Sequence, residues 1–177
     1  MGNFKTSIST ALVILLLGIS ALNATDNAAL KIRILEFENA VKNNNMDSIL
    51  NVVPPKIMAT ISEKFNINIE QLQAAMKDAM VNAMASVTML SFKMDLENAV
   101  KKETVAGRIY LLVPTTTTMT LDETEVQSKS HTLAFVDGGT WYLVRISDDQ
   151  QVQFLKAAYP EFDSVTFPKG TTQLLEN

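Results

Sequence analysis

Cysteine is absent from the 177-residue chain, and histidine occurs only once. Without cysteine the chain has no disulfide, no thiolate nucleophile, no zinc–thiolate site and no cysteine-linked lipid. A single histidine also excludes a metal site built from several histidines of one chain. These absences exclude most familiar enzyme chemistries, and we expect neither a metal nor a cofactor.

Clustered positive charge is lacking as well. The chain has 15 lysines and arginines against 19 acidic residues, which gives a formal net charge of -4. The adjacent pair Lys101-Lys102 is followed at once by Glu103. Because binding to a phosphate backbone requires a clustered basic surface, nucleic acid is not an expected partner.

Sequence motifs of catalysis are missing too. The six glycines are scattered, so no phosphate-binding loop is formed, and no serine lies in a nucleophile-elbow pattern. The acidic groups are a cluster at 122–125 and the pair Asp95 and Glu97, which we place at a solvated turn and on a polar strand face. Carboxylates divide into acid and base only when burial separates their pKa values, so neither group predicts a catalytic pair.

The amino terminus has the pattern of a secretory signal peptide over residues 1–24. Lys5 supplies a short positive start, Ala11–Leu17 (ALVILLL) is an apolar core, and small residues lead to Ala24. A membrane-spanning helix needs ~20 apolar residues, and this core is shorter, although an uncleaved anchor remains the alternative. We expect a secreted protein, periplasmic if the host is Gram-negative, with no stable membrane insertion after cleavage.

Residues before about 87 have helical periodicity. Asn68 with Gln71 forms a capping-box pattern, and Pro54-Pro55 suits the first turn of a helix. Four helical segments are expected, three from apolar residues at intervals of three and four and one from a short apolar stretch: 30–41, 57–65, 72–84 and 49–53.

After residue 87 the apolar period drops to two, which is typical of half-buried strands. Asp137-Gly138-Gly139-Thr140 predicts a hairpin, and Pro114 predicts a bulge or an edge within its strand, since proline donates no ladder hydrogen bond. The expected strands are 90–97, 109–121, 126–136 and 141–146.

A last helix is expected between Asp148 and Tyr159, and the tail after it is expected to cross the surface. Helices, an antiparallel meander and a further helix define an α+β fold. We therefore predict one α+β domain over 25–177, with N-terminal helices packed on a sheet of about four strands and a short helix after the last strand.

Two segments resemble a known superfamily. Phe37-Glu38-Asn39-Ala40-Val41, followed by the polar turn 43–47 and Ile49-Leu50, is similar to the opening of the nuclear-transport-factor-2-like (ketosteroid-isomerase-like, cystatin-like α+β) superfamily. Trp141-Tyr142-Leu143-Val144 is similar to its aromatic last strand. The resemblance implies a curved sheet that wraps a long helix and leaves a cavity open at one end. No catalytic motif of that superfamily is matched, so no functional residue is transferred.

His131 is the first candidate for acid–base chemistry, because its unperturbed pKa lies near neutrality. On a strand it shares a face with Lys129, Leu133 and Phe135, which would suit the rim of a cavity. Alternatively, it is an ordinary surface histidine on a strand.

Methionines form a stripe on one predicted helix. Met76, Met80 and Met84 recur at intervals of four, and thioethers line adaptable apolar pockets as readily as they fill cores. With Phe135 and Trp141 they are the candidate ligand-binding residues. Packing of the helix on the sheet would place the stripe in an ordinary core instead.

Two functions remain open. The first is an exported non-enzymatic binding module, for a small apolar ligand in a cavity or for a protein partner on the sheet face. In the second case Tyr110, Trp141 and Tyr142 would be exposed anchors, and a homodimer is possible. The alternative is a cavity enzyme of isomerase or dehydratase type, with His131 or a buried carboxylate as general base.

Overall fold

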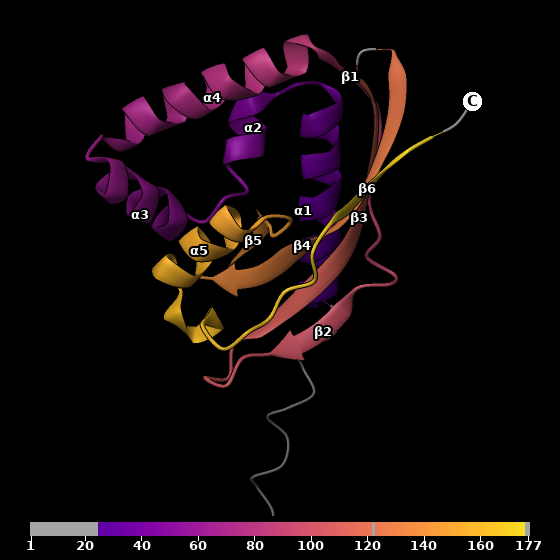
Figure 1. The fold of residues 1–177 in the computed structure, drawn as a ribbon. Coiled ribbons are helices and arrows are strands. Elements are labelled where there is room, and N and C mark those ends of the chain that lie inside the picture. The colour runs from indigo at the N-terminus through magenta and orange to yellow at the C-terminus, as the bar shows by residue number, and fades with distance from the viewer. Residues whose placement is uncertain (1–24, 122, 176–177) are drawn as a thin grey trace, which may run out of the picture.

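Four helices precede the sheet in a computed structural model that describes residues 25–121 and 123–175 (Figure 1). The predicted signal peptide and Asp122 lie outside the described residues. The helices are α1 (Thr25–Lys42), α2 (Met46–Leu50), α3 (Pro55–Phe65) and α4 (Ile69–Ala85). None of the helices in the described part of the chain is both long enough and apolar enough to cross a membrane.

Polar side chains set the ends of these helices as the sequence predicted. The Asn68 side chain accepts a hydrogen bond of 2.8 Å from the backbone N–H of Gln71, whose side chain accepts one of 3.1 Å in return. This capping box pairs backbone donors that α4 leaves free at its start. Asn66 ends α3 in the left-handed conformation with φ of 51°, which asparagine tolerates better than most residues.

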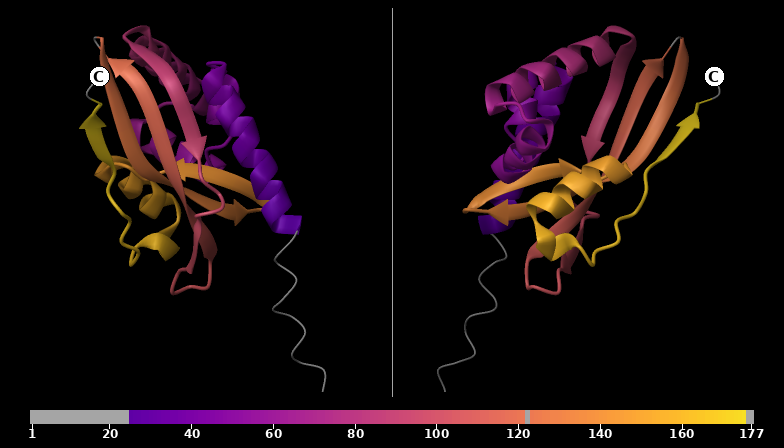
Figure 2. Two further views of the ribbon diagram at one scale, coloured as in Figure 1. Left: turned by 90° about the vertical axis from the view of Figure 1, so that its right-hand side faces the viewer. Right: turned by 60° about the vertical axis from the view of Figure 1, so that its left-hand side comes forward.

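Six antiparallel strands form the sheet, in the order β1-β3-β4-β5, with β2 pairing with β3 and β6 with β4. Each long central strand therefore has two shorter strands along its outer side, and the sheet is strongly curved (Figures 1 and 2). The strands are β1 (Val87–Met94), β2 (Val100–Glu103), β3 (Ile109–Leu121), β4 (Thr124–Asp137), β5 (Thr140–Arg145) and β6 (Thr171–Leu174).

This architecture confirms the predicted α+β class and adds β2 and β6 to the four expected strands. The predicted hairpin at 137–140 joins β4 to β5, and Gly138 and Gly139 have φ of 56° and 80° there. Glycine takes such positive φ without a steric penalty. The predicted C-terminal helix is α5 (Asp149–Ala158), followed by the 3₁₀ turn η1 (Pro160–Phe162).

Pro114 lies within β3, and the ladder to β4 runs past it without a shift of register. The irregularity of the sheet falls instead between Met89 and Ser91 of β1. On the other side of β3, β1 ends opposite Thr115 and β2 begins opposite Leu112, so Pro114 lies at the break between them. A residue without an N–H is tolerated there because no strand is paired at that point.

Both faces of the sheet carry a hydrophobic core. On one face, here called the α1 face, Leu30 and Ile34 of α1 pack with Met94, Val113 and Leu143. On the opposite α5 face, the core includes Phe135, Leu155, Tyr159 and Phe162. Six further buried residues belong to it: Ile57, Tyr110, Leu112, Leu133, Val144 and Ile146. The two views of Figure 2 show α1 and α5 on opposite sides of the sheet.

Candidate binding pocket

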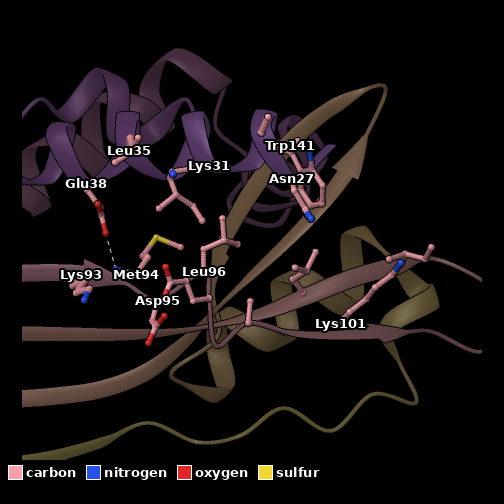
Figure 3. A pocket seen from close by; sticks show the side chains of 16 residues that line it. Asn27, Lys31, Leu35, Glu38, Lys93, Met94, Asp95, Leu96, Lys101 and Trp141 are labelled. Carbon is pink, nitrogen blue, oxygen red and sulfur yellow. Dashed lines mark hydrogen bonds between the residues drawn. The ribbon is translucent and has the colours of Figure 1, made fainter. Parts of the chain in front are cut away.

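A pocket of about 720 Å³ lies on the α1 face (Figure 3). It is lined by α1 between Asn27 and Glu38, the end of β1, the loop to β2, and residues of β2, β3 and β5. This volume is within the ~300–1,000 Å³ range of small-molecule sites. The pocket therefore has room for a ligand of several hundred daltons.

Apolar side chains from five segments supply most of its lining. Ile34 and Met94 belong to the buried core, whereas Leu35 is 48% exposed at the pocket mouth. The apolar lining residues are Ala28, Ile34, Leu35, Met94, Leu96, Ala99, Ile109, Leu111 and Trp141. Asn27 and charged side chains of both signs complete the lining: Lys31, Glu38, Lys93, Asp95, Glu97 and Lys101.

Glu38 fixes α1 against the end of β1. Its Oε1 accepts a hydrogen bond of 2.7 Å from the backbone N–H of Met94, which the dashed line in Figure 3 marks. Met94 belongs to β1, an edge strand of the sheet among the described residues, so no strand pairs with the N–H that Met94 points outward. The carboxylate of Glu38 is thus used to satisfy the backbone and to hold the helix over the pocket.

The loop between β1 and β2 is held by Asp95. Its two carboxylate oxygens accept hydrogen bonds from the backbone N–H and the side-chain Nδ2 of Asn98, at 3.2 and 2.7 Å. These bonds lower the pKa of Asp95, with the side chain of Asn98 as the largest cause. The Asp95 N–H also donates to the carbonyl of Pro114 at 2.8 Å, so the loop closes one side of the pocket as a fixed turn.

Trp141 is half-buried and belongs to β5, where it pairs with Val136 across the hairpin. Next along this strand, the N–H of Leu143 donates to the carbonyl of Val52 at 2.9 Å. The segment after α2 therefore covers the outer edge of β5. This contact fixes β5, the strand that carries Trp141.

The predicted ligand-binding residues are spread over three places. Trp141 lines the α1 pocket, and Met76, Met80 and Met84 lie half-buried along α4 and are not part of its lining. Phe135 is fully buried on the α5 face, with its ring centroid 5.0 Å from that of Tyr159. The structure therefore does not bring the methionine stripe, Phe135 and Trp141 together.

None of the three aromatic residues expected to be exposed anchors on the sheet is fully exposed, and one is buried. Tyr110 is only 3% exposed and packs edge-on against Phe162, with centroids 5.4 Å apart. It faces the core because it shares the α5 face with Leu112 and Phe135. Trp141 and Tyr142 are each half-buried.

His131 lies on the opposite side of the sheet from the α1 pocket, in a smaller recess of about 420 Å³. The C-terminal tail covers it with Phe167 and Pro168, and Lys102 lies on the rim. Its Nδ1 is buried without a hydrogen-bond partner. Burial lowers the pKa of His131, and the positive charge of Lys102 lowers it further.

No carboxylate is among the described residues that line this recess. The described residues also contain no group of three or more His, Asp or Glu side chains arranged to hold a metal ion. His131 therefore has no oriented acidic partner of the kind that prepares a general base.

Sequence reasoning missed most of the pocket. It assigned Leu96, Asp95 and Glu97 to a strand that in fact ends at Met94. The periodicity of α1 and the alternation of β3 did identify Ile34 and Leu111 as apolar face residues. Nothing in those patterns indicated that the two faces would meet beside Trp141.

No family model, curated protein or solved structure matches the chain. The resemblance to the nuclear-transport-factor-2-like superfamily therefore stays a prediction. What the structure defines is an α+β protein with a helix-covered curved sheet and a pocket beneath the start of the first helix.

Proposed function

We propose that the protein is an exported, non-enzymatic binding module that takes a small apolar molecule into the α1 pocket. The observation that carries this proposal is the apolar lining around Trp141, which includes Leu96 and Leu111 in a cavity of about 720 Å³. Pockets for small molecules have this composition, mostly apolar with a few polar groups at fixed positions. The export part of the proposal rests on the leader pattern alone.

The arrangement of titratable groups supports binding over catalysis. The candidate base His131 lies on the α5 face, away from the α1 pocket. Within the pocket, Glu38 and Asp95 accept hydrogen bonds from Met94 and Asn98 and so already serve the fold, and the third carboxylate of the lining, Glu97, is exposed to solvent. An isomerase or dehydratase mechanism needs a base that points at the substrate, and none of these groups is arranged in that way.

A protein partner on the exposed sheet face has less support. The uncovered half of the α5 face carries polar residues such as Thr116, Thr118 and Lys129, and Tyr110 is not available as an anchor. Aromatic anchors dominate the energetics of protein interfaces. A homodimer formed through this face would lack the same aromatic anchor, and it stays a prediction.

The single tryptophan makes the proposal directly testable. Trp141 lines the pocket, so a bound dye that absorbs at its emission wavelength will accept its excitation energy. We expect N-phenyl-1-naphthylamine, a neutral apolar dye, to show saturable energy transfer from Trp141. Absence of saturable transfer in the folded mature protein, with this dye and with a panel of similar apolar dyes, contradicts the proposal.

Two adjacent alanines give a matched pair of variants. Ala28 and Ala29 are both exposed on α1, and only Ala28 belongs to the pocket lining. Ala28→Phe is expected to fill part of the pocket and reduce dye binding, whereas Ala29→Phe should leave it unchanged. Equal effects of the two substitutions would place the dye elsewhere on the molecule.

A further inference from the structure

The charges around the α1 pocket are unequally committed to the fold. Among its acidic residues, Glu38 accepts a hydrogen bond from the backbone N–H of Met94, and Asp95 accepts one from the side chain of Asn98. The side-chain ammonium groups of Lys31 and Lys101 form no ion pair and no hydrogen bond with any residue in 25–121 or 123–175. Apart from that of Glu97, the charge at the pocket that is still available to a ligand is therefore positive.

Lys31 and Lys101 reach the pocket from two different elements. Lys31 lies on α1 one turn before Leu35, and both line the pocket. Lys101 of β2 is paired with Leu111 of β3, and directly paired residues of an antiparallel ladder point to the same face. The two ammonium groups thus belong to the same cavity as the apolar residues Leu35 and Leu111.

We propose that the natural ligand is an amphipathic anion, with its apolar chain on the lining near Trp141 and its anionic head group at the lysines of the pocket wall, Lys31 of α1 and Lys101 of β2 (Figure 3). This inference rests on the proposed binding function and adds the chemical class of the ligand. Charge complementarity carries it, because two ammonium groups without partners lie at the edge of an apolar cavity in a chain whose net charge is -4. Such groups attract an anion more strongly once apolar surface around them excludes water.

Glu97 is the exception among the acidic residues of the pocket. Its carboxylate is exposed and forms no ion pair or hydrogen bond within the described part of the chain, so it opposes an anionic ligand. Glu97→Gln should therefore strengthen binding of an anion and leave binding of an uncharged ligand unchanged. This opposite sign separates an electrostatic effect from a general loss of structure.

The experiment compares three probes with the same twelve-carbon chain: dodecanoate, 1-dodecanol and dodecyltrimethylammonium. Dodecanoate and dodecyltrimethylammonium are titrated below their critical micelle concentrations and dodecanol below its solubility limit, while the fluorescence of Trp141 is recorded. We expect the order dodecanoate, dodecanol, dodecyltrimethylammonium from tightest to weakest. Equal binding of all three, or preference for the cation, overturns the anion proposal and leaves the binding function standing. No response to any probe overturns both.

Two double variants distinguish the effect of Lys31 and Lys101 from that of other lysines on the same helix and strand. Lys31→Gln with Lys101→Gln should weaken dodecanoate binding by roughly fivefold, the combined effect of two exposed ion pairs, without changing dodecanol binding. The control pair is Lys42→Gln with Lys102→Gln, which changes the same net charge on α1 and β2 outside the pocket lining. An equal loss in the control pair overturns the assignment of the head group.

The same chemistry occurs in free fatty acids and in anionic membrane lipids. Vesicles of phosphatidylglycerol provide the second arm of the test. A response of Trp141 to both vesicles and dodecanoate, lost in the Lys31 and Lys101 double variant, assigns a membrane lipid as the source. A response to dodecanoate alone assigns a free amphiphile. A response to vesicles without one to dodecanoate overturns the pocket as the site.

Discussion

The hydroxyl of Tyr159 donates a hydrogen bond of 2.8 Å to Oδ2 of Asp137, joining the end of α5 to the β4–β5 hairpin. Tyr159 is 1% exposed, and Asp137 also lies 3.6 Å from Nζ of Lys56 on α3. Burial raises the pKa of Tyr159, and its hydrogen bond to Asp137 raises it further. A helix, a hairpin and the start of α3 are thus held by one carboxylate.

Tyr159→Phe tests this contact with minimal change of shape. Because the variant removes only the hydroxyl and leaves the ring packed against Phe135, we expect a loss of about 1 kcal/mol in the free energy of unfolding. Urea denaturation followed by circular dichroism measures it. Tyr142→Phe is the control, because the hydroxyl of the half-buried Tyr142 forms no hydrogen bond with any described residue. Equal losses in the two variants would contradict the role assigned to Asp137.

Arg108 forms the second connection in this region. Its Nε donates to Glu161, and its Nη1 donates to the carbonyl of Val136 at 2.7 Å. Lysine has a single ammonium group and cannot reproduce this fork, so Arg108→Lys should cost about 1–3 kcal/mol of stability. Arg145→Lys, at an exposed position, should cost less than about 0.5 kcal/mol. Equal urea midpoints for the two variants would show that the fork is not needed.

Glu38→Ala removes the acceptor that α1 supplies to β1. The N–H of Met94 is then left without its partner in a part-buried position, which should cost about 1–3 kcal/mol. The exposed Glu36, which forms only a surface ion pair with Arg33, provides the control substitution Glu36→Ala. We also expect Glu38→Ala to weaken dye binding in the α1 pocket, because α1 is then less firmly held over it. Unchanged stability and unchanged binding would both count against this contact.

The fold class was predictable because the hydrophobic period changes once along the chain. Intervals of three and four before residue 87 require helices, and alternation after it requires strands. The strands β2 and β6 escaped prediction because every residue of Val100–Glu103 and Thr171–Leu174 is exposed. A strand that buries no side chain leaves no alternation in the sequence, and only its pairing with β3 or β4 defines it.

The pocket was harder to predict than the fold. Its formation depends on Asp95 and Asn98 making a turn that separates β1 from β2 while both remain paired with β3. That register is a long-range property, and the sequence pattern around Asp95 is equally consistent with a continuing strand. For the methionine stripe, the interval of four identified which face of α4 is turned inward. It did not indicate that Met76, Met80 and Met84 would be only half-buried.

His131 provides a prediction of pH dependence. Its pKa is lowered in the folded protein, chiefly by burial and then by Lys102, from the usual value of 6.5. The unfolded chain therefore takes up this proton at a higher pH than the folded chain does. Stability should fall as the pH decreases from 6.5 toward the lower folded-state pKa, and it should be unaffected by this group above 6.5.

His131→Gln removes the titrating group and keeps a polar side chain beneath the tail. Between pH 7.5 and pH 5, we expect the free energy of unfolding of the unmodified protein to decrease more than that of the variant. Lys102→Gln should make the decrease smaller, because it removes the second cause of the shift. The carboxylates titrate equally in both proteins, so the difference between the two curves isolates His131. Parallel curves across this range would mean that the tail at Phe167 and Pro168 does not keep the imidazole from its proton.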